Sequence, residues 1–106
     1  MFNNVTDDNI DRYLESGQLK RIYLISPDYF GGSEGADNQF FGTPDAEKEK
    51  QRSDDELYNA LKKGKKVSNF HIDLNYEETS KSIVPKRITV TAMIDGEDYR
   101  RIIEVW

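Results

Sequence analysis

Histidine and cysteine, the side chains that most readily act as a base or a nucleophile near neutral pH, are scarce in this chain. Its 106 residues include one histidine and no cysteine, which excludes disulfides, thiolate metal sites and a cysteine nucleophile. The histidine, His71, falls on the polar side of an alternating stretch, which favours a surface histidine over a base that the fold brings to a site. No ordered serine and aspartate spacing accompanies it, so a catalytic triad is not supported.

Two groups of acids lie at the starts of predicted helices. Asp45 and Glu47 could bind Mg²⁺ through oxygen, but the positive end of a helix dipole also favours acids in a first turn. Asp7, Asp8 and Asp11 are interpreted either as a solvated helix start or as a docking face for a basic partner. Neither group has the convergent loop geometry of a cation site, so we predict no metal site and no cofactor.

Basic and aromatic residues form two further groups. The lysines at positions 62, 63, 65 and 66 could contact phosphate, although the last turn of a helix also favours lysine through its dipole. Four aromatic residues flank the glycines of a long predicted loop: Tyr29, Phe30, Phe40 and Phe41. Aromatics on an exposed loop suit protein recognition, and the same side chains could equally fold into the core. We retain both interpretations and treat these four residues as candidate partner-binding residues.

Composition narrows the class of protein. Hydrophobic residues make up 36% and charged residues 33% of the chain, which is typical of one folded domain, here residues 1–106. The net charge of −5 makes nucleic acid an unexpected partner and favours another protein, in particular a basic one. No apolar run has the length of a membrane span and no leader pattern is present, so we expect a cytoplasmic protein without membrane contact.

The elements that position these residues follow from hydrophobic spacing and turn chemistry. Helices are expected over 6–16 and over 44–63, with the polar first half of the longer helix facing solvent. Strands are expected over 19–25, 70–76, 88–92 and 99–106, and residues 26–43 form a loop. Asp95-Gly96 predicts a hairpin between the last two strands. The fold class is therefore α+β, with an antiparallel sheet of about four strands and two helices packed on one side.

Several short segments, in order, resemble DNA/RNA non-specific endonucleases of the ββα-metal (His-Me finger) class. They include Arg21 to Ile25, Phe30-Gly31-Gly32-Ser33, Asp37-Asn38 and the helix exit Leu57 to Val67. Tyr76, 80–85 and 89–100 continue the resemblance, which spans roughly residues 19–106. It implies a strand carrying a general-base histidine and a following helix carrying a metal-binding asparagine.

This chain departs from that pattern at both positions. Tyr23 stands where the resemblance places the histidine, and a tyrosine of ordinary pKa, near 10, is a poor base at neutral pH. No asparagine lies between Pro44 and Glu47. We therefore expect a non-catalytic protein-binding domain on a nuclease-like frame, such as an immunity or regulatory protein. The alternatives are a divergent metal-dependent nuclease using Asp45, Glu47 or His71, and an accessory domain that pairs through the edge of its final strand.

Overall fold

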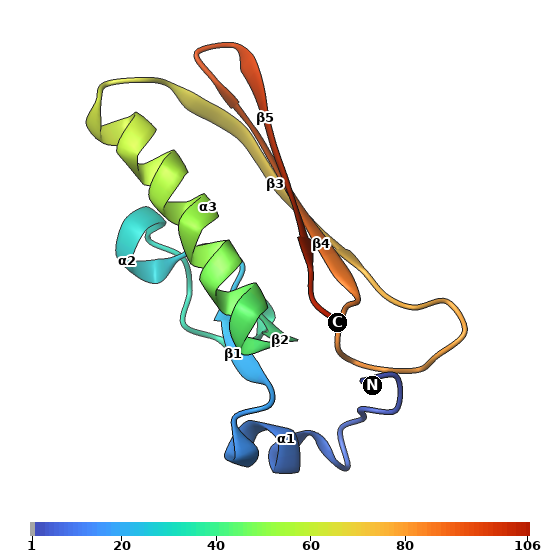
Figure 1. Ribbon diagram of the computed structural model, residues 1–106. Coiled ribbons are helices and arrows are strands. Elements are labelled where there is room, and N and C mark those ends of the chain that lie inside the picture. The colour runs from blue at the N-terminus through green and yellow to red at the C-terminus, as the bar shows by residue number, and fades with distance from the viewer. Residues whose placement is uncertain (1) are drawn as a thin grey trace.

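The computed structural model describes residues 2–106 of the chain (Figure 1). In chain order the elements are α1 (Ile10–Ser16), β1 (Lys20–Tyr23), α2 (Pro27–Phe30), the 3₁₀ helix η1 (Ala36–Asn38), β2 (Gln39–Gly42), α3 (Pro44–Lys62), β3 (Val67–Asn75), β4 (Arg87–Ile94) and β5 (Glu97–Glu104). The α+β class is confirmed.

The strands divide between two antiparallel sheets instead of forming one sheet of about four. β1 pairs with β2, and β3, β4 and β5 form a three-stranded sheet with β4 in the middle. Both sheets contact α3: Figure 1 shows α2 and the larger sheet on opposite sides of this helix and the small sheet beside its N-terminal end. The long helix is therefore enclosed from two directions.

The expected start and end of the long helix are confirmed. Thr43 caps α3 by accepting a hydrogen bond from the Ala46 N–H at 3.3 Å, and Pro44 occupies the first turn, where no N–H is needed. Gly64, just beyond the end, adopts a φ of +81°. The expectation that the first half faces solvent holds for Glu47, Lys48, Gln51 and Arg52, which are exposed. It is wrong for Lys50, Ser53 and Asp54, which are buried.

Other segments differ from the expected elements. The first helix begins at Ile10 instead of Thr6. Residues 26–43 are not one loop, because they contain α2, η1 and the strand β2. In the larger sheet, β3 begins three residues earlier than expected and carries a bulge between Ser68 and His71.

Apolar side chains form two buried clusters. The larger one joins the N-terminal segment to both sheets and includes Phe2, Val5, Ile22, Phe40 and Ile103. The smaller one lies under the second half of α3. Among residues 2–106, no helix is both long and apolar enough to span a bilayer.

Candidate functional site

A polar cleft lies between β1, α2 and the first half of α3. It has a volume of about 290 Å³. Its lining residues are Arg21, Ile22, Tyr23, Ser26, Pro27, Asp28, Glu34, Glu47, Lys50, Gln51 and Asp54. The cleft thus brings together Tyr23, at the end of β1, and Glu47, in the first turn of α3.

A buried ion pair forms part of the α3 wall of this cleft. The Lys50 side chain spans one helical turn, and its Nζ lies 2.8 Å from Oδ1 of Asp54. Lys50 is only 1% exposed. Burial lowers the pKa of Lys50, and the Asp54 charge opposes that shift. Burial raises the pKa of Asp54, against the effect of Lys50. Desolvation therefore weakens the charged form of each partner.

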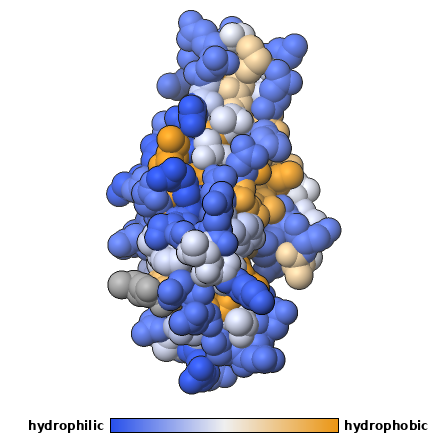
Figure 2. Space-filling model, turned by 90° about the vertical axis from the view of Figure 1, so that its right-hand side faces the viewer, coloured by the Kyte–Doolittle hydropathy of each residue, from blue (hydrophilic) through white to orange (hydrophobic). Residues whose placement is uncertain are grey.

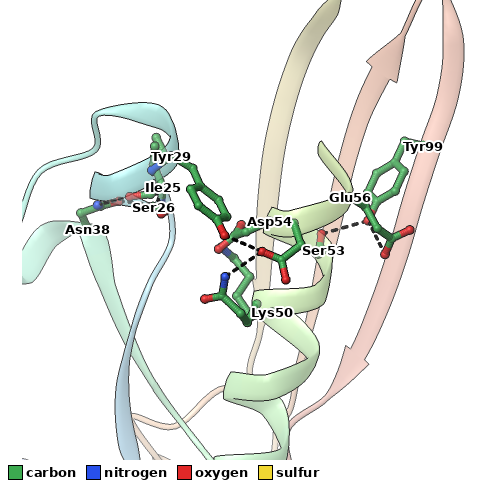
Figure 3. A network of polar contacts seen from close by, with 11 residues as sticks. Ile25, Ser26, Tyr29, Asn38, Lys50, Ser53, Asp54, Glu56 and Tyr99 are labelled. Carbon is green, nitrogen blue, oxygen red and sulfur yellow. Dashed lines mark hydrogen bonds and ion pairs between the residues drawn. The ribbon is translucent and has the colours of Figure 1, made fainter. Parts of the chain in front are cut away.

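A second polar contact joins α2 to α3. The Tyr29 hydroxyl donates a hydrogen bond to Oδ1 of Asp55 at 2.7 Å, and the Gln51 amide donates to the same oxygen at 3.0 Å. Tyr29 also stacks on Tyr58, with ring centroids 4.3 Å apart. Figure 3 shows Tyr29 extending from α2 toward α3 at the level of Lys50 and Asp54.

These hydrogen bonds shift two pKa values in opposite directions. The bond from Tyr29, followed by that from Gln51, lowers the pKa of Asp55 below 3.8. The same bond to Asp55 raises the pKa of Tyr29 above 10.0. Tyr29 therefore keeps its proton at neutral pH and acts as a hydrogen-bond donor.

Asn38 fixes the segment that carries α2. Its Oδ1 accepts the Ile25 N–H at 2.9 Å, and its Nδ2 donates to the carbonyls of Ile25 and Ser33 at 2.8 and 2.7 Å. Gly32 is required beside this contact, because a Cβ there would lie 2.0 Å from the Ile25 carbonyl oxygen. This buried asparagine explains why residues 26–43 adopt an ordered path.

The opposite side of α3 is fixed to the larger sheet by polar contacts. The Tyr99 hydroxyl donates to Ser53 Oγ at 3.1 Å, as seen at the right of Figure 3. Arg101 donates to Glu49 at 2.9 Å and also pairs with Glu56. The charged residues of α3 therefore hold the helix in place from two sides.

An apolar groove lies on the other side of α2 from the cleft. Its volume is about 260 Å³, and it is lined by Ile25, Phe30, Leu57, Leu61, Val67 and Phe70. Ile25 and Leu61 are each 41% exposed. α2 contributes Asp28 to the cleft and Phe30 to the groove, so the two depressions share this short helix.

The candidate aromatic residues divide between surface and core. Tyr29 and Phe30 are half-buried and lie edge to face, with centroids 6.1 Å apart. Phe41 is half-buried beneath the guanidinium of Arg21, 5.2 Å from the ring centroid. Phe40 is 4% exposed and belongs to the larger core cluster. The structure therefore gives Phe40 a packing role.

Apart from Glu47, the candidate charged residues do not line the cleft. Asp7, Asp8 and Asp11 are exposed around the start of α1, and none of them lines the cleft. Lys62 lies over the ring of Tyr58 at 5.4 Å, while the neighbouring lysines are exposed. Asp45 is exposed in the first turn of α3.

His71 lies on the exposed face of β3. Its Nε2 lies 2.8 Å from Oδ1 of Asp73, and both side chains are exposed. No group of three or more histidine or acidic side chains that could hold a metal ion occurs within residues 2–106. The structure does not bring His71 to Asp45 or Glu47.

Sequence reasoning singled out Tyr23 and Glu47, and it noted Asn38 only as part of the Asp37-Asn38 segment of the resemblance. It missed Lys50, Asp54 and Asp55 as parts of this region. A signal for one pair was present, since Lys50 and Asp54 are four residues apart on a helix.

No protein-family model and no curated protein matches this chain.

Proposed function

We propose that this chain is a non-catalytic protein-binding domain on a nuclease-like frame, serving as an immunity or regulatory protein. The observation that carries the proposal is the buried Lys50 ammonium in the cleft that also holds Tyr23. An ammonium group there repels a divalent cation and occupies the nearest carboxylate, that of Asp54.

The order of elements supports the nuclease-like frame. β1 and β2 are antiparallel strands followed directly by α3, the order that the endonuclease resemblance implies. Tyr23 and Glu47 line one cleft, as the positions of the base and the metal ligand would. The groups found at those positions are a tyrosine and a glutamate in the first turn of α3, in place of the histidine and the asparagine that the resemblance implies.

The groove beside Phe30 is the surface best suited to a protein partner. Its lining is apolar, and two of its members, Ile25 and Leu61, are substantially exposed. The cleft lies next to the groove and is lined by the carboxylates of Asp28, Glu34 and Glu47. Within residues 2–106, none of these three carboxylates forms an ion pair. A partner segment with an apolar side chain in the groove and basic side chains toward the cleft complements both depressions.

A divergent metal-dependent nuclease is the second candidate, because Glu47 lines the cleft with Tyr23. Degradation of plasmid DNA and RNA with Mg²⁺ or Mn²⁺ separates the two candidates, using wild type, Glu47→Ala and His71→Ala. We expect no cleavage above a protein-free blank at high protein concentration. Cleavage that Glu47→Ala abolishes and wild type retains would overturn the non-catalytic proposal.

The binding surface is tested separately by capture from native lysate of the source cells. The double variant Ile25→Glu/Leu61→Glu alters the groove, and Tyr76→Glu is the matched control, since Tyr76 is 48% exposed and lies outside the groove. We expect a protein held by wild type and by Tyr76→Glu but not by the groove variant, and its purified form to bind directly. Failure to capture any such protein contradicts the proposal.

A further inference from the structure

The larger sheet has two edges of different character. β3, at one edge, contains the bulge at Ser68 to His71, where Asn69 has a φ of +53°. Bulges of this kind prevent a further strand from pairing. β5, at the other edge, pairs with β4 through an uninterrupted register from Glu97 to Glu104 and contains neither a bulge nor a proline.

The backbone groups of β5 alternate between β4 and the outside. The two-residue turn at Asp95-Gly96 makes Ile94 and Glu97 a hydrogen-bonded pair. Val105, another odd-numbered residue, likewise points its N–H toward β4, because it donates to the Lys86 carbonyl at 2.8 Å. The even-numbered residues of β5 therefore direct their N–H and C=O groups away from β4. Within residues 2–106 no hydrogen bond from another segment reaches these groups.

The same even-numbered residues carry the side chains on the face that α3 does not cover. Figure 2 views the molecule from that side and shows a mainly hydrophilic surface with small apolar patches. Ile102, in the middle of this row, is 50% exposed. Arg100 and Glu104 lie two residues to either side of it and are also exposed.

We propose that two copies of this chain associate by antiparallel pairing of β5 with β5, about a two-fold axis at Ile102. In this register the two Ile102 side chains lie opposite each other, and Arg100 of each copy lies opposite Glu104 of the other. Three residue pairs exchange two backbone hydrogen bonds each. The product is a continuous six-stranded sheet.

Charge complementarity selects a second copy as the occupant of this edge. An arginine and a glutamate placed symmetrically about an isoleucine satisfy each other only when the same sequence runs in the opposite direction. Glu104 already accepts a hydrogen bond from Arg87 through Oε1 at 2.8 Å. Its second oxygen remains for Arg100 of the other copy. The pairing uses neither the cleft nor the groove beside Phe30, so it does not depend on the proposed function.

Sedimentation equilibrium of the full chain over a wide concentration range tests the pairing. Wild type should approach twice the monomer mass at high concentration. Ile102→Lys places two ammonium groups at the axis and should remain monomeric with an unchanged far-UV circular dichroism spectrum. A wild type that is monomeric at every concentration, or a dimer that Ile102→Lys leaves intact, overturns the proposal.

Charge reversal tests the register itself. Arg100→Glu and Glu104→Arg should each weaken self-association about tenfold, since each creates two like-charge cross-strand pairs. Mixing these two variants should restore association, because all opposing pairs are then of opposite charge. Arg12→Glu is the control: it makes the same change of charge as Arg100→Glu at an exposed position of α1, outside the sheet, and should dimerise as wild type does. A mixture no tighter than either variant alone excludes this register.

Discussion

The acidic side chains of α3 that face α2 are held by specific partners. Asp55 accepts hydrogen bonds from Tyr29 and Gln51, and Asp54 pairs with Lys50. These contacts differ in solvation, because the Lys50 pair is buried and Asp55 is only half-buried. They therefore respond differently to substitution and to pH.

The first prediction concerns the pKa of Asp55. Because its hydrogen bonds lower this pKa below 3.8, Asp55 contributes stability that is present above pH 3.8 and is lost as the pH falls through the folded-state value. Tyr29→Phe removes the stronger donor and should return the pKa toward 3.8, whereas Gln51→Ala should shift it less. Carboxyl carbon chemical shifts followed by NMR during acid titration measure both changes. An unchanged pKa in Tyr29→Phe would contradict the assigned cause.

The second prediction concerns the Lys50–Asp54 pair. Lys50→Met leaves a buried carboxylate without its partner and should lower the free energy of unfolding by about 3 to 5 kcal/mol. Lys50→Met/Asp54→Leu removes both charges and should recover most of that loss. Urea unfolding at neutral pH measures the two values. If the double variant is no more stable than the single one, the loss is due to packing and not to the orphaned charge.

At the scale of elements, Thr43 joins the start of α3 to the end of β5. Its Oγ1 accepts from Ala46 N–H and donates to the Val105 carbonyl at 2.9 Å. We predict that Thr43→Ala lowers the free energy of unfolding by about 1 to 2 kcal/mol, because the cap and the inter-element bond are both lost. Thr43→Ser keeps both bonds and should remain close to wild type in chemical denaturation. Equal losses in the two variants would rule out the hydroxyl as the cause.

Elements with strong local signals could be predicted from the sequence. The cap at Thr43, the alternation along β3 and β4 and the Asp95-Gly96 turn depend on neighbouring residues, so the bounds of the long helix and the presence of β3, β4 and β5 could be predicted. The division of the strands between two sheets could not, because it depends on contacts between distant segments. β2 was not predicted, because Gly42 and the turn residues before Gln39 favour a loop more strongly than four residues can indicate a strand. That strand exists because Phe40 enters the core and Asn38 holds the segment before it.

The burial of polar residues on α3 could not be predicted from periodicity. Alternating charges along residues 45–55 are typical of a solvated helix face. Here α2 and the larger sheet cover α3 from two directions, so Lys50, Ser53 and Asp54 become buried and find partners on neighbouring elements or on α3 itself. Likewise, Tyr23 and Glu47 were each noted from the sequence, but only the fold places them in one cleft.

At the scale of the whole molecule, the N-terminal segment is part of the main core. Val5 is fully buried, and its carbonyl accepts the Ile83 N–H at 3.0 Å. Trp106, the one tryptophan of the chain, lies over Lys86 at 4.2 Å, and its indole N–H donates to Val84. Core, termini and sheet therefore meet at residues 82–86.

We predict that Val5→Ala lowers the free energy of unfolding by about 2 kcal/mol, from lost apolar burial and the cavity that remains. Trp106 fluorescence and far-UV circular dichroism should shift to the same new urea midpoint, because one cooperative domain is expected. Val67→Ala, at a half-buried position, should cost less. Separate transitions for the two probes would contradict a single domain.

The hydrogen bond from Ser82 to the Phe2 carbonyl spans 80 residues, and this separation has a kinetic consequence. Closing so long a loop carries a large entropic cost before any contact repays it. The β3–β4–β5 meander and the cap of α3 need only short loops, so they should form first. The N-terminal segment should then dock last during folding and detach first during partial opening, while the sheet remains intact.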